Sequence, residues 1–322
     1  MHKRFVNHCT IDLTIIPDSP ILIKSGKEGA DPTKPDMEFV ETYHAGGRSI
    51  YLPGSSLKGA IRAHAERIVR TVGSEERPPE NISKLWANNP LSNDDYLDKF
   101  KKQNQNNIHL GANLYKLSSF TDQIFGNTSI ASRIRIEDAH PDSSQPLRIE
   151  ERNGVAIDRV FGSVAVGPFN YQVCTAGEFK TKIHLKNFTL AQLGLIGLVL
   201  RDLNDGWFGL GFAKSRGLGT VEVKLNQAVV QYPGCELQDG KISALGSAKQ
   251  WNHTFLLGVG EFLETDDAKL YGFPTVDNQD TPVAAQAMDL GFGVQMTWRE
   301  GTVNDLFERC VRSWSNLLVG VK

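Results

Sequence analysis

The 322-residue sequence predicts an α+β fold in which two helices pack on one face of an antiparallel sheet. Three observations support this class: segments with alternating polar and apolar residues, segments with apolar residues at helical spacing, and their order along residues 1–225. That order is strand, helix, strand, strand, helix, strand, with insertions. It is the order of a ferredoxin-like unit, whose free sheet face is a common platform for RNA.

The first strand and helix are predicted from residues 9–72. Residues 9–16 alternate polar and apolar side chains, as a half-buried strand does. A short apolar run at 21–23 follows, and then a loop rich in glycine and proline that continues through Asp36. Pro53-Gly54-Ser55-Ser56 marks the start of a helix, because apolar residues recur from there to residue 72 at helical spacing.

The second half of the core is predicted in the same way. Residues 130–137 alternate again, and 179–185 indicate another strand. Residues 190–203 form an apolar helix with Thr189 as its N-cap, and 220–225 form the last core strand.

Two regions depart from this pattern. Residues 75–120 are polar and rich in asparagine, which predicts an insertion or a small lid. Residues 226–322 are predicted to be a C-terminal extension packed on the core, closed by an apolar-faced helix near 303–318.

Composition limits the class of protein. No apolar window is long enough for a membrane span, and the first residues lack the apolar run of a signal peptide. The four cysteines are far apart and none has CxxC spacing, so neither a disulfide framework nor a cysteine-based zinc site is expected. These features favour a cytoplasmic location.

The net charge of −2 does not indicate a nucleic-acid-binding protein, but the charges are unevenly distributed. Residues 48–70 are locally basic, and such a patch can bind phosphates. A solvated helix face explains the same charges equally well. The basic residues are Arg48, Lys58, Arg62, Arg67 and Arg70, against Glu66 alone.

Residues 52–62 (LPGSSLKGAIR) form the first candidate phosphate site. The start of a helix leaves backbone N–H groups free for an anion. Ser55 and Ser56 can cap the helix or bond to a phosphate oxygen, and Lys58 and Arg62 add positive charge. A nucleotide-binding P-loop is excluded, because the lysine precedes the glycine and alanine follows it.

Residues 209–219 (GLGFAKSRGLG) form the second candidate site. Its glycines allow a nucleic-acid backbone to approach closely. The candidate contacts are Lys214, Ser215, Arg216 and Gly217, although turns account for most glycine-rich runs of this kind. We also expect Arg133, in the alternating segment 130–137, to contact RNA.

Together, the two segments resemble the RAMP superfamily of CRISPR-associated proteins, in which a PGSSLKG helix start lies early and a G-x-SRGLG loop precedes the last core strand. Three further stretches are similar: ILIKSG at 21–26, FGNTSIASRIRIEDA at 125–139, and AIDR at 156–159 followed by AGEF at 176–179. The resemblance covers about residues 8–225. It is strongest for the backbone subunits of type III effector complexes and implies a ferredoxin-like (RRM-like) core.

The resemblance also implies partners. Backbone subunits line up along a guide CRISPR RNA with other RAMP subunits and the large subunit, and a thumb hairpin reaches between bases of the guide–target RNA duplex. Residues 162–175, with Phe169 and Tyr171, are the candidate thumb. An ordinary hairpin with exposed aromatic residues is the alternative.

Cleavage of the target RNA is implied for an aspartate in the loop before the PGSS helix. Asp31 matches best because it directly precedes a proline, and Asp36 is the reserve candidate. A carboxylate there can position a divalent metal ion, expected to be Mg²⁺, or assist proton transfer. No metal ligand is assigned, and a solvated or turn-forming acid is the alternative for both residues.

Three functions therefore stay open. The first is a backbone subunit that acts as an endoribonuclease on target RNA. The second is a RAMP subunit that only binds guide RNA and assembles the complex. The third is a stand-alone guide-processing ribonuclease, for which His44 and His64 near the basic helix are the candidate pair.

Overall fold

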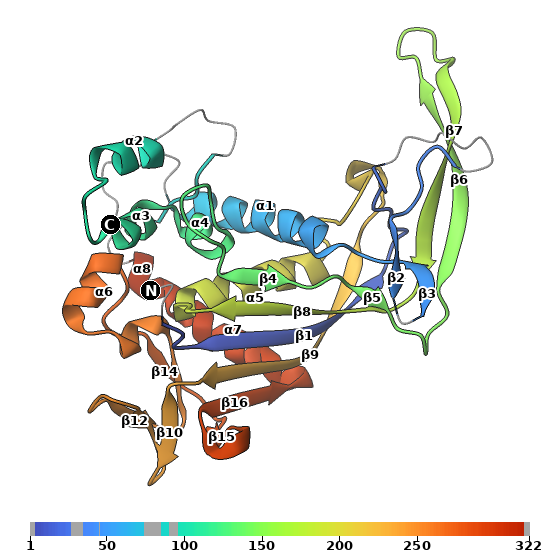
Figure 1. The fold of residues 1–322 in the computed structure, drawn as a ribbon. Coiled ribbons are helices and arrows are strands. Elements are labelled where there is room, and N and C mark those ends of the chain that lie inside the picture. The colour runs from blue at the N-terminus through green and yellow to red at the C-terminus, as the bar shows by residue number, and fades with distance from the viewer. Residues whose placement is uncertain (1–3, 27–34, 45, 74–84, 90–95, 319–322) are drawn as a thin grey trace.

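The computed structural model describes residues 4–26, 35–44, 46–73, 85–89 and 96–318. Within these residues the molecule is built on a seven-stranded sheet in which every pairing is antiparallel. Helices pack against the sheet, and a long hairpin projects from one end of the body (Figure 1). No described helix is long and apolar enough to cross a membrane.

The central strands and two helices form a ferredoxin-like core, which confirms the predicted fold class. The strands lie in the order β9, β1, β8, β4, and the chain runs through β1, α1, β4, β8, α5 and β9. This is the predicted succession of elements. Their bounds are β1 His8–Pro17, α1 Gly54–Val72, β4 Ile134–Ile136, β8 Phe179–Lys186, α5 Leu190–Asn204 and β9 Val221–Tyr232.

Alternation along the strands separates the buried face from the polar face. On β1, Ile11 and Leu13 are buried, and on β8 Ile183 and Leu185 are buried beside them. The intervening side chains of these strands, such as Lys182, are polar. Helix α5 is buried along nearly its whole length, which explains why residues 190–203 are apolar all round. Thr189 is the N-cap of this helix, as the sequence predicts, and it forms a capping box with Gln192.

The C-terminal region is continuous with this core. Strand β9 runs across residue 225, where the sequence suggests a boundary, and β16 pairs with β9 to extend the sheet. Helix α7 packs on α5 where Gly194 and Gly197 leave room for the backbone of Cys310 and the ring of Phe307. The elements here are β15 Gln286–Ala287, β16 Val294–Arg299, α7 Val303–Arg312 and α8 Trp314–Leu318.

The remaining C-terminal elements form a smaller layer at the end of the sheet away from the hairpin (Figure 1). Strands β10, β11 and β12 form one small sheet, and β13 pairs with β14. The bounds are β10 Cys235–Gln238, β11 Lys241–Ala244, β12 Gln250–Asn252, β13 Phe255–Leu257, α6 Thr265–Tyr271 and β14 Asn278–Asp280.

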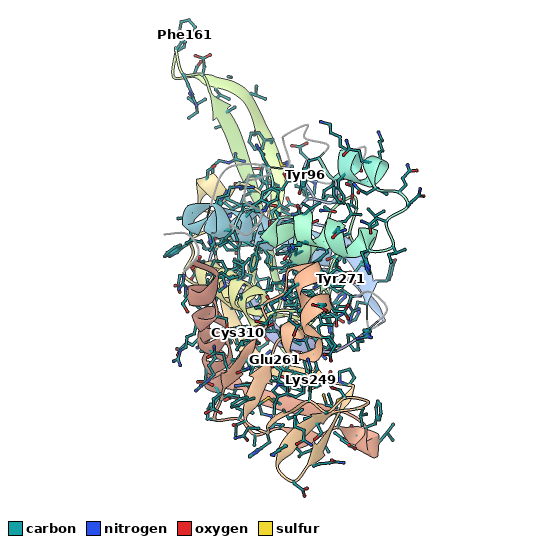
Figure 2. All side chains as sticks on the ribbon, turned by 90° about the vertical axis from the view of Figure 1, so that its left-hand side faces the viewer. Tyr96, Phe161, Lys249, Glu261, Tyr271 and Cys310 are labelled. Atoms are coloured by element: carbon teal, nitrogen blue, oxygen red, sulfur yellow. The ribbon has the colours of Figure 1, made fainter. Side chains whose placement is uncertain are left out.

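The described part of the predicted insertion contains two helices, whereas its described residues 85–89 are not helical. Helices α2 (Tyr96–Gln103) and α3 (Leu110–Leu117) precede α4 (Phe120–Phe125). They form a satellite hydrophobic cluster with the C-terminal layer, and Tyr96 of α2 and Tyr271 of α6 lie on the same side of the body (Figure 2). The buried members are Leu97, Leu114, Tyr115, Ile130, Val259, Leu263, Ala268 and Phe273. The described part of the insertion is therefore packed into the body.

The projecting hairpin consists of β6 (Arg148–Ile157) and β7 (Val164–Ala176). The predicted thumb at 162–175 thus corresponds to the second strand, and the hairpin begins earlier than predicted. Single bridges from Ile21 to Cys174 and from Met37 to Tyr171 attach two early segments to its base. Beside that base lie the short strands β2 Glu41–His44, β3 Gly47–Ile50 and β5 His140–Pro141.

Candidate RNA-binding surface

Helix α1 begins close to strand β4. A Cβ atom at Gly54 would overlap the carbonyl oxygen of Ile136, so only glycine fits this approach. The Gly54 N–H donates to Asp138 Oδ1 at 2.7 Å, and one free N–H of the helix start is thereby satisfied. Ser55 and Ser56 are exposed on the first turn, where their hydroxyl groups can reach a phosphate.

Lys58 and Arg62 are only partly available to a ligand. Lys58 Nζ donates to Ser132 Oγ at 2.9 Å, and burial, together with the nearby Arg62 charge, lowers the pKa of this lysine. Arg62 donates to Asp122 Oδ1 at 2.7 Å and to Glu66 Oε1 at 2.9 Å. Arg62 therefore holds α1 to α4, and the two exposed serines are the more accessible predicted contacts on this helix.

The structure corrects the placement of Arg133. Its side chain is buried, with the guanidinium 3.9 Å from the ring centroid of Tyr115, and it donates to Tyr115 Oη and to the Asn187 carbonyl. Strand β4 begins only at Ile134, so Arg133 lies before the alternation starts and does not share a face with the exposed Arg135. Arg133 is thus a structural residue that is not available to RNA.

The glycine-rich loop presents its predicted contacts to solvent. Residues Lys214–Arg216 form a single 3-10 turn between Ala213 and Gly217, which both have left-handed backbone conformations, and residues 214–217 are all exposed. A backbone hydrogen bond attaches the loop to the segment that contains Leu22. The Phe212 N–H donates to the Leu22 carbonyl at 2.7 Å. A Cβ atom at Gly211 would overlap that carbonyl, so the anchoring requires glycine.

Sequence reasoning missed one cation of this surface. Lys24 Nζ lies 3.8 Å from the ring centroid of Phe212, and the Arg216 guanidinium carbon lies 4.9 Å from the same centroid. The ring attracts both cations and so keeps two positive charges near each other at the surface. Two converging cations suit a phosphate group. The signal was present as the lysine of ILIKSG, but only the fold brings it to the loop.

The candidate catalytic loop is attached to the base of the hairpin. Asp31 lies outside the described residues. Asp36 is exposed, and its Oδ2 accepts a hydrogen bond from the Asn170 N–H of β7 at 2.8 Å. The next residue, Met37, bridges to Tyr171. The structure therefore brings the end of the aspartate loop to the strand that carries the predicted thumb residues.

The predicted thumb aromatic residues lie nearer the base of the hairpin than most of its exposed apolar side chains. Phe169 and Tyr171 are partly buried, and the ring of Phe169 covers Gly154 on the opposite strand. The tip exposes other side chains, among which Val160 is 81% and Phe161 84% exposed. Figure 2 shows Phe161 at the far end of the hairpin. The other exposed large apolar residues of the hairpin are Ile149, Val155, Ile157, Val164 and Val166.

A local turn fixes this tip. Asp158 Oδ1 accepts hydrogen bonds from the N–H groups of Val160 at 2.7 Å and Phe161 at 2.8 Å. These bonds, that from Phe161 first, lower the pKa of the Asp158 carboxyl group. The turn therefore presents two adjacent large apolar side chains to solvent in an ordered arrangement.

A family model described as the RAMP superfamily matches residues 14–222, which is more than half of the chain. The chain belongs to the RAMP superfamily. No curated protein matches the sequence. The matched region spans the exposed serines of α1, the hairpin and the glycine-rich loop. As a RAMP protein, the chain is a CRISPR-associated, RNA-binding protein that works with RNA and other subunits.

The two candidate histidines, His44 and His64, have separate partners and do not form the converging pair that a metal-independent ribonuclease would need. His64 is buried, its Nε2 lies 2.7 Å from Asp202 Oδ2, and its ring stacks on Phe208. His44 is exposed and stacks instead on His140. Among the described residues, moreover, no three His, Cys, Asp or Glu side chains are grouped so that they could hold a metal ion.

Proposed function

We propose that this RAMP protein is a backbone subunit of a type III CRISPR effector complex that binds guide RNA and cleaves complementary target RNA at regular intervals. The observation that carries the proposal is the attachment of the aspartate loop to the hairpin through Asp36 and Asn170. A wedge that distorts RNA and a carboxylate that cleaves it must act on neighbouring nucleotides, so a fixed connection between them supports both roles.

The hairpin supplies the wedge in this proposal. Apolar side chains inserted between base steps unstack them, at a cost of a few kcal/mol per step. Val160 and Phe161 have the exposure and size for this role. A displaced nucleotide can then align its 2′-OH with the adjacent phosphate, which is the geometry that in-line cleavage needs.

The guide RNA is held by its phosphates at two places. Ser55 and Ser56 lie at the start of α1, and Lys24, Lys214 and Arg216 lie on or against the glycine-rich loop. The two predicted contacts Ser215 and Gly217 are exposed on the same turn and can offer a hydroxyl or backbone N–H group. Phosphate contacts of this kind position RNA without reading its sequence.

Asp31 is the proposed catalytic residue. Asp36 has one carboxylate oxygen engaged by the hairpin backbone, which favours a role in positioning the loop. Mg²⁺ is the proposed cofactor. The described residues offer no group of protein ligands for it, and we therefore assign it no ligand set and no step.

The test is target cleavage by the complex assembled with guide RNA, the other RAMP subunits and the large subunit. We expect Asp31→Ala to assemble normally and to lose the regularly spaced cuts, with a decrease of about 100-fold or more in rate. Asp36→Ala is the matched variant, and we expect a smaller decrease. Normal cleavage by both variants would contradict the catalytic role and leave the subunit as a non-catalytic RNA-binding component.

A further inference from the structure

Three aromatic side chains form a stack beside the base of the hairpin. The rings of His44 and His140 are parallel, with centroids 3.7 Å apart and 8° between their planes. Tyr51 continues the stack on His140 at 5.8 Å and 14°. The three residues come from β2, from β5 and from the segment after β3, so the fold and not the local sequence builds the stack.

The outer end of this stack is open to solvent. Tyr51 and His140 are half-buried, whereas His44 at the end of β2 is exposed. Among the described residues, the ring of His44 has His140 as its aromatic neighbour. Three flat rings therefore end in an exposed imidazole face.

Two cations beside the stack are already paired with carboxylates. Arg48, opposite Tyr43 in the β2–β3 hairpin, forms an ion pair with Glu41 at 2.6 Å. Lys180, opposite His140 in the sheet, pairs with Asp142. Recognition at this surface therefore depends on the ring face more than on net charge.

The stack lies next to the proposed guide-RNA path. Tyr51 is followed by Leu52, which bridges to Ala139, the neighbour of His140. The same segment leads directly into α1 and its exposed serines. A nucleotide whose phosphate contacts those serines is thus near a stacking surface.

We infer that the stack formed by Tyr51, His140 and His44 is a binding site for one unpaired nucleobase of bound RNA, which packs on the open face of His44. The inference rests on the proposed RNA-binding function and adds a base contact to it. Parallel rings 3.7 Å apart have a spacing close to that of stacked bases. The same geometry argues against acid–base catalysis by His44 and His140. Their rings are stacked face to face, and no phosphate fits between them.

The test uses the full chain and a 20-nucleotide single-stranded RNA that carries 2-aminopurine at one position in turn. Fluorescence of this base is quenched when it stacks. We expect strong quenching at one position or a few adjacent positions. His44→Ala should abolish it and weaken RNA binding about 5- to 50-fold, since one base–aromatic stack contributes that much.

Two matched variants keep the outcome unambiguous. His44→Phe should retain the quenching, because a flat ring is preserved. Tyr43→Ala removes the neighbouring, 81% exposed ring and should leave both quenching and affinity unchanged. The same quenching in His44→Ala as in the wild type, or its loss in His44→Phe, would overturn the inference.

The failure of the inference and of the proposed function are distinguishable. Arg216→Ala should weaken RNA binding wherever the 2-aminopurine is placed. The position at which its fluorescence is quenched should stay the same. If the wild-type chain binds RNA without any position-specific quenching, the stacking site is rejected and the proposed function stands. If the wild-type chain binds no RNA, the proposed function fails. If His44→Ala impairs only the association between protein copies, the stack is a protein contact and the inference is overturned.

Discussion

The hairpin and the helical insertion both extend the ferredoxin-like core, yet they treat their apolar residues in opposite ways. The insertion buries Leu114 and Tyr115 in a satellite cluster against the C-terminal layer. The hairpin instead exposes Val160 and Phe161 at its tip. A group of exposed apolar side chains on one element marks a contact surface, whereas a buried apolar cluster is part of the fold. The comparison indicates that the hairpin is a contact surface and that the insertion contributes to the stability of the fold.

Removing a side chain from the buried cluster of the insertion should cause the largest loss of stability. Tyr115 is buried, and its Oη accepts hydrogen bonds from Arg133 at 3.0 Å and from Gln192 at 2.9 Å. Tyr115→Ala removes the ring and one of the acceptors of two buried donors, Arg133 and Gln192. We expect a loss of about 3–5 kcal/mol in the free energy of unfolding, measured by urea denaturation.

Tyr115→Phe is the control, because it keeps the ring and removes only the hydroxyl group. We expect it to cost about 1–3 kcal/mol. A loss below about 1 kcal/mol for Tyr115→Ala would show that the insertion is not part of the folded body and would undo the comparison.

The sequence predicted the core because its signals are local. Alternation marks β1 and β8, and helical spacing marks α1, so these elements are visible without any knowledge of the fold. Arg133 was misplaced because the strand begins at Ile134 and not at residue 130, so the strand alternation does not extend to Arg133. Local signals could not predict the position of Lys24, because its contact with Phe212 is tertiary.

The candidate site depends on such contacts between distant residues. Asp36 meets Asn170, and Lys24 meets Phe212, across long separations in the chain. Nothing in the composition of either segment indicates its partner. The exposed tip was also missed. Phe169 and Tyr171 were chosen because they are aromatic, whereas exposure depends on the position of the turn between the two strands.

Between about pH 4 and 7, the C-terminal layer under the insertion should respond to pH and the hairpin should not. Burial raises the pKa of Asp277 to about 7, and the N–H groups of Leu190 and Gly260 oppose the shift only in part. The folded protein therefore retains a proton that the unfolded chain loses near pH 4. Stability consequently falls as the pH rises from about 4 through 7, where the group ionises in the folded state.

Asp277→Asn tests this effect because it stays neutral at every pH. We expect its stability relative to the wild type to increase by about 2–3 kcal/mol between pH 5 and pH 8. Hydrogen exchange at pH 8 should show faster opening of α6 in the wild type than in the variant, with β6 and β7 unchanged. A pH-independent difference between the two proteins would contradict the assignment.

The hairpin tip should show the smallest effect on stability and a selective effect on function. Phe161 is 84% exposed, and Ile108 in the insertion is 90% exposed, so the two form a matched pair. Replacing either with serine should change the free energy of unfolding by less than about 0.5 kcal/mol, because each side chain buries little apolar area in the folded protein. In the assembled complex, Phe161→Ser should weaken target-RNA binding or cleavage about 5- to 100-fold through the lost stacking contact. Ile108→Ser should leave both unchanged. Equal effects of the two substitutions would show that exposure alone does not identify the hairpin as the contact surface, because the same exposure in the insertion would then have the same consequence.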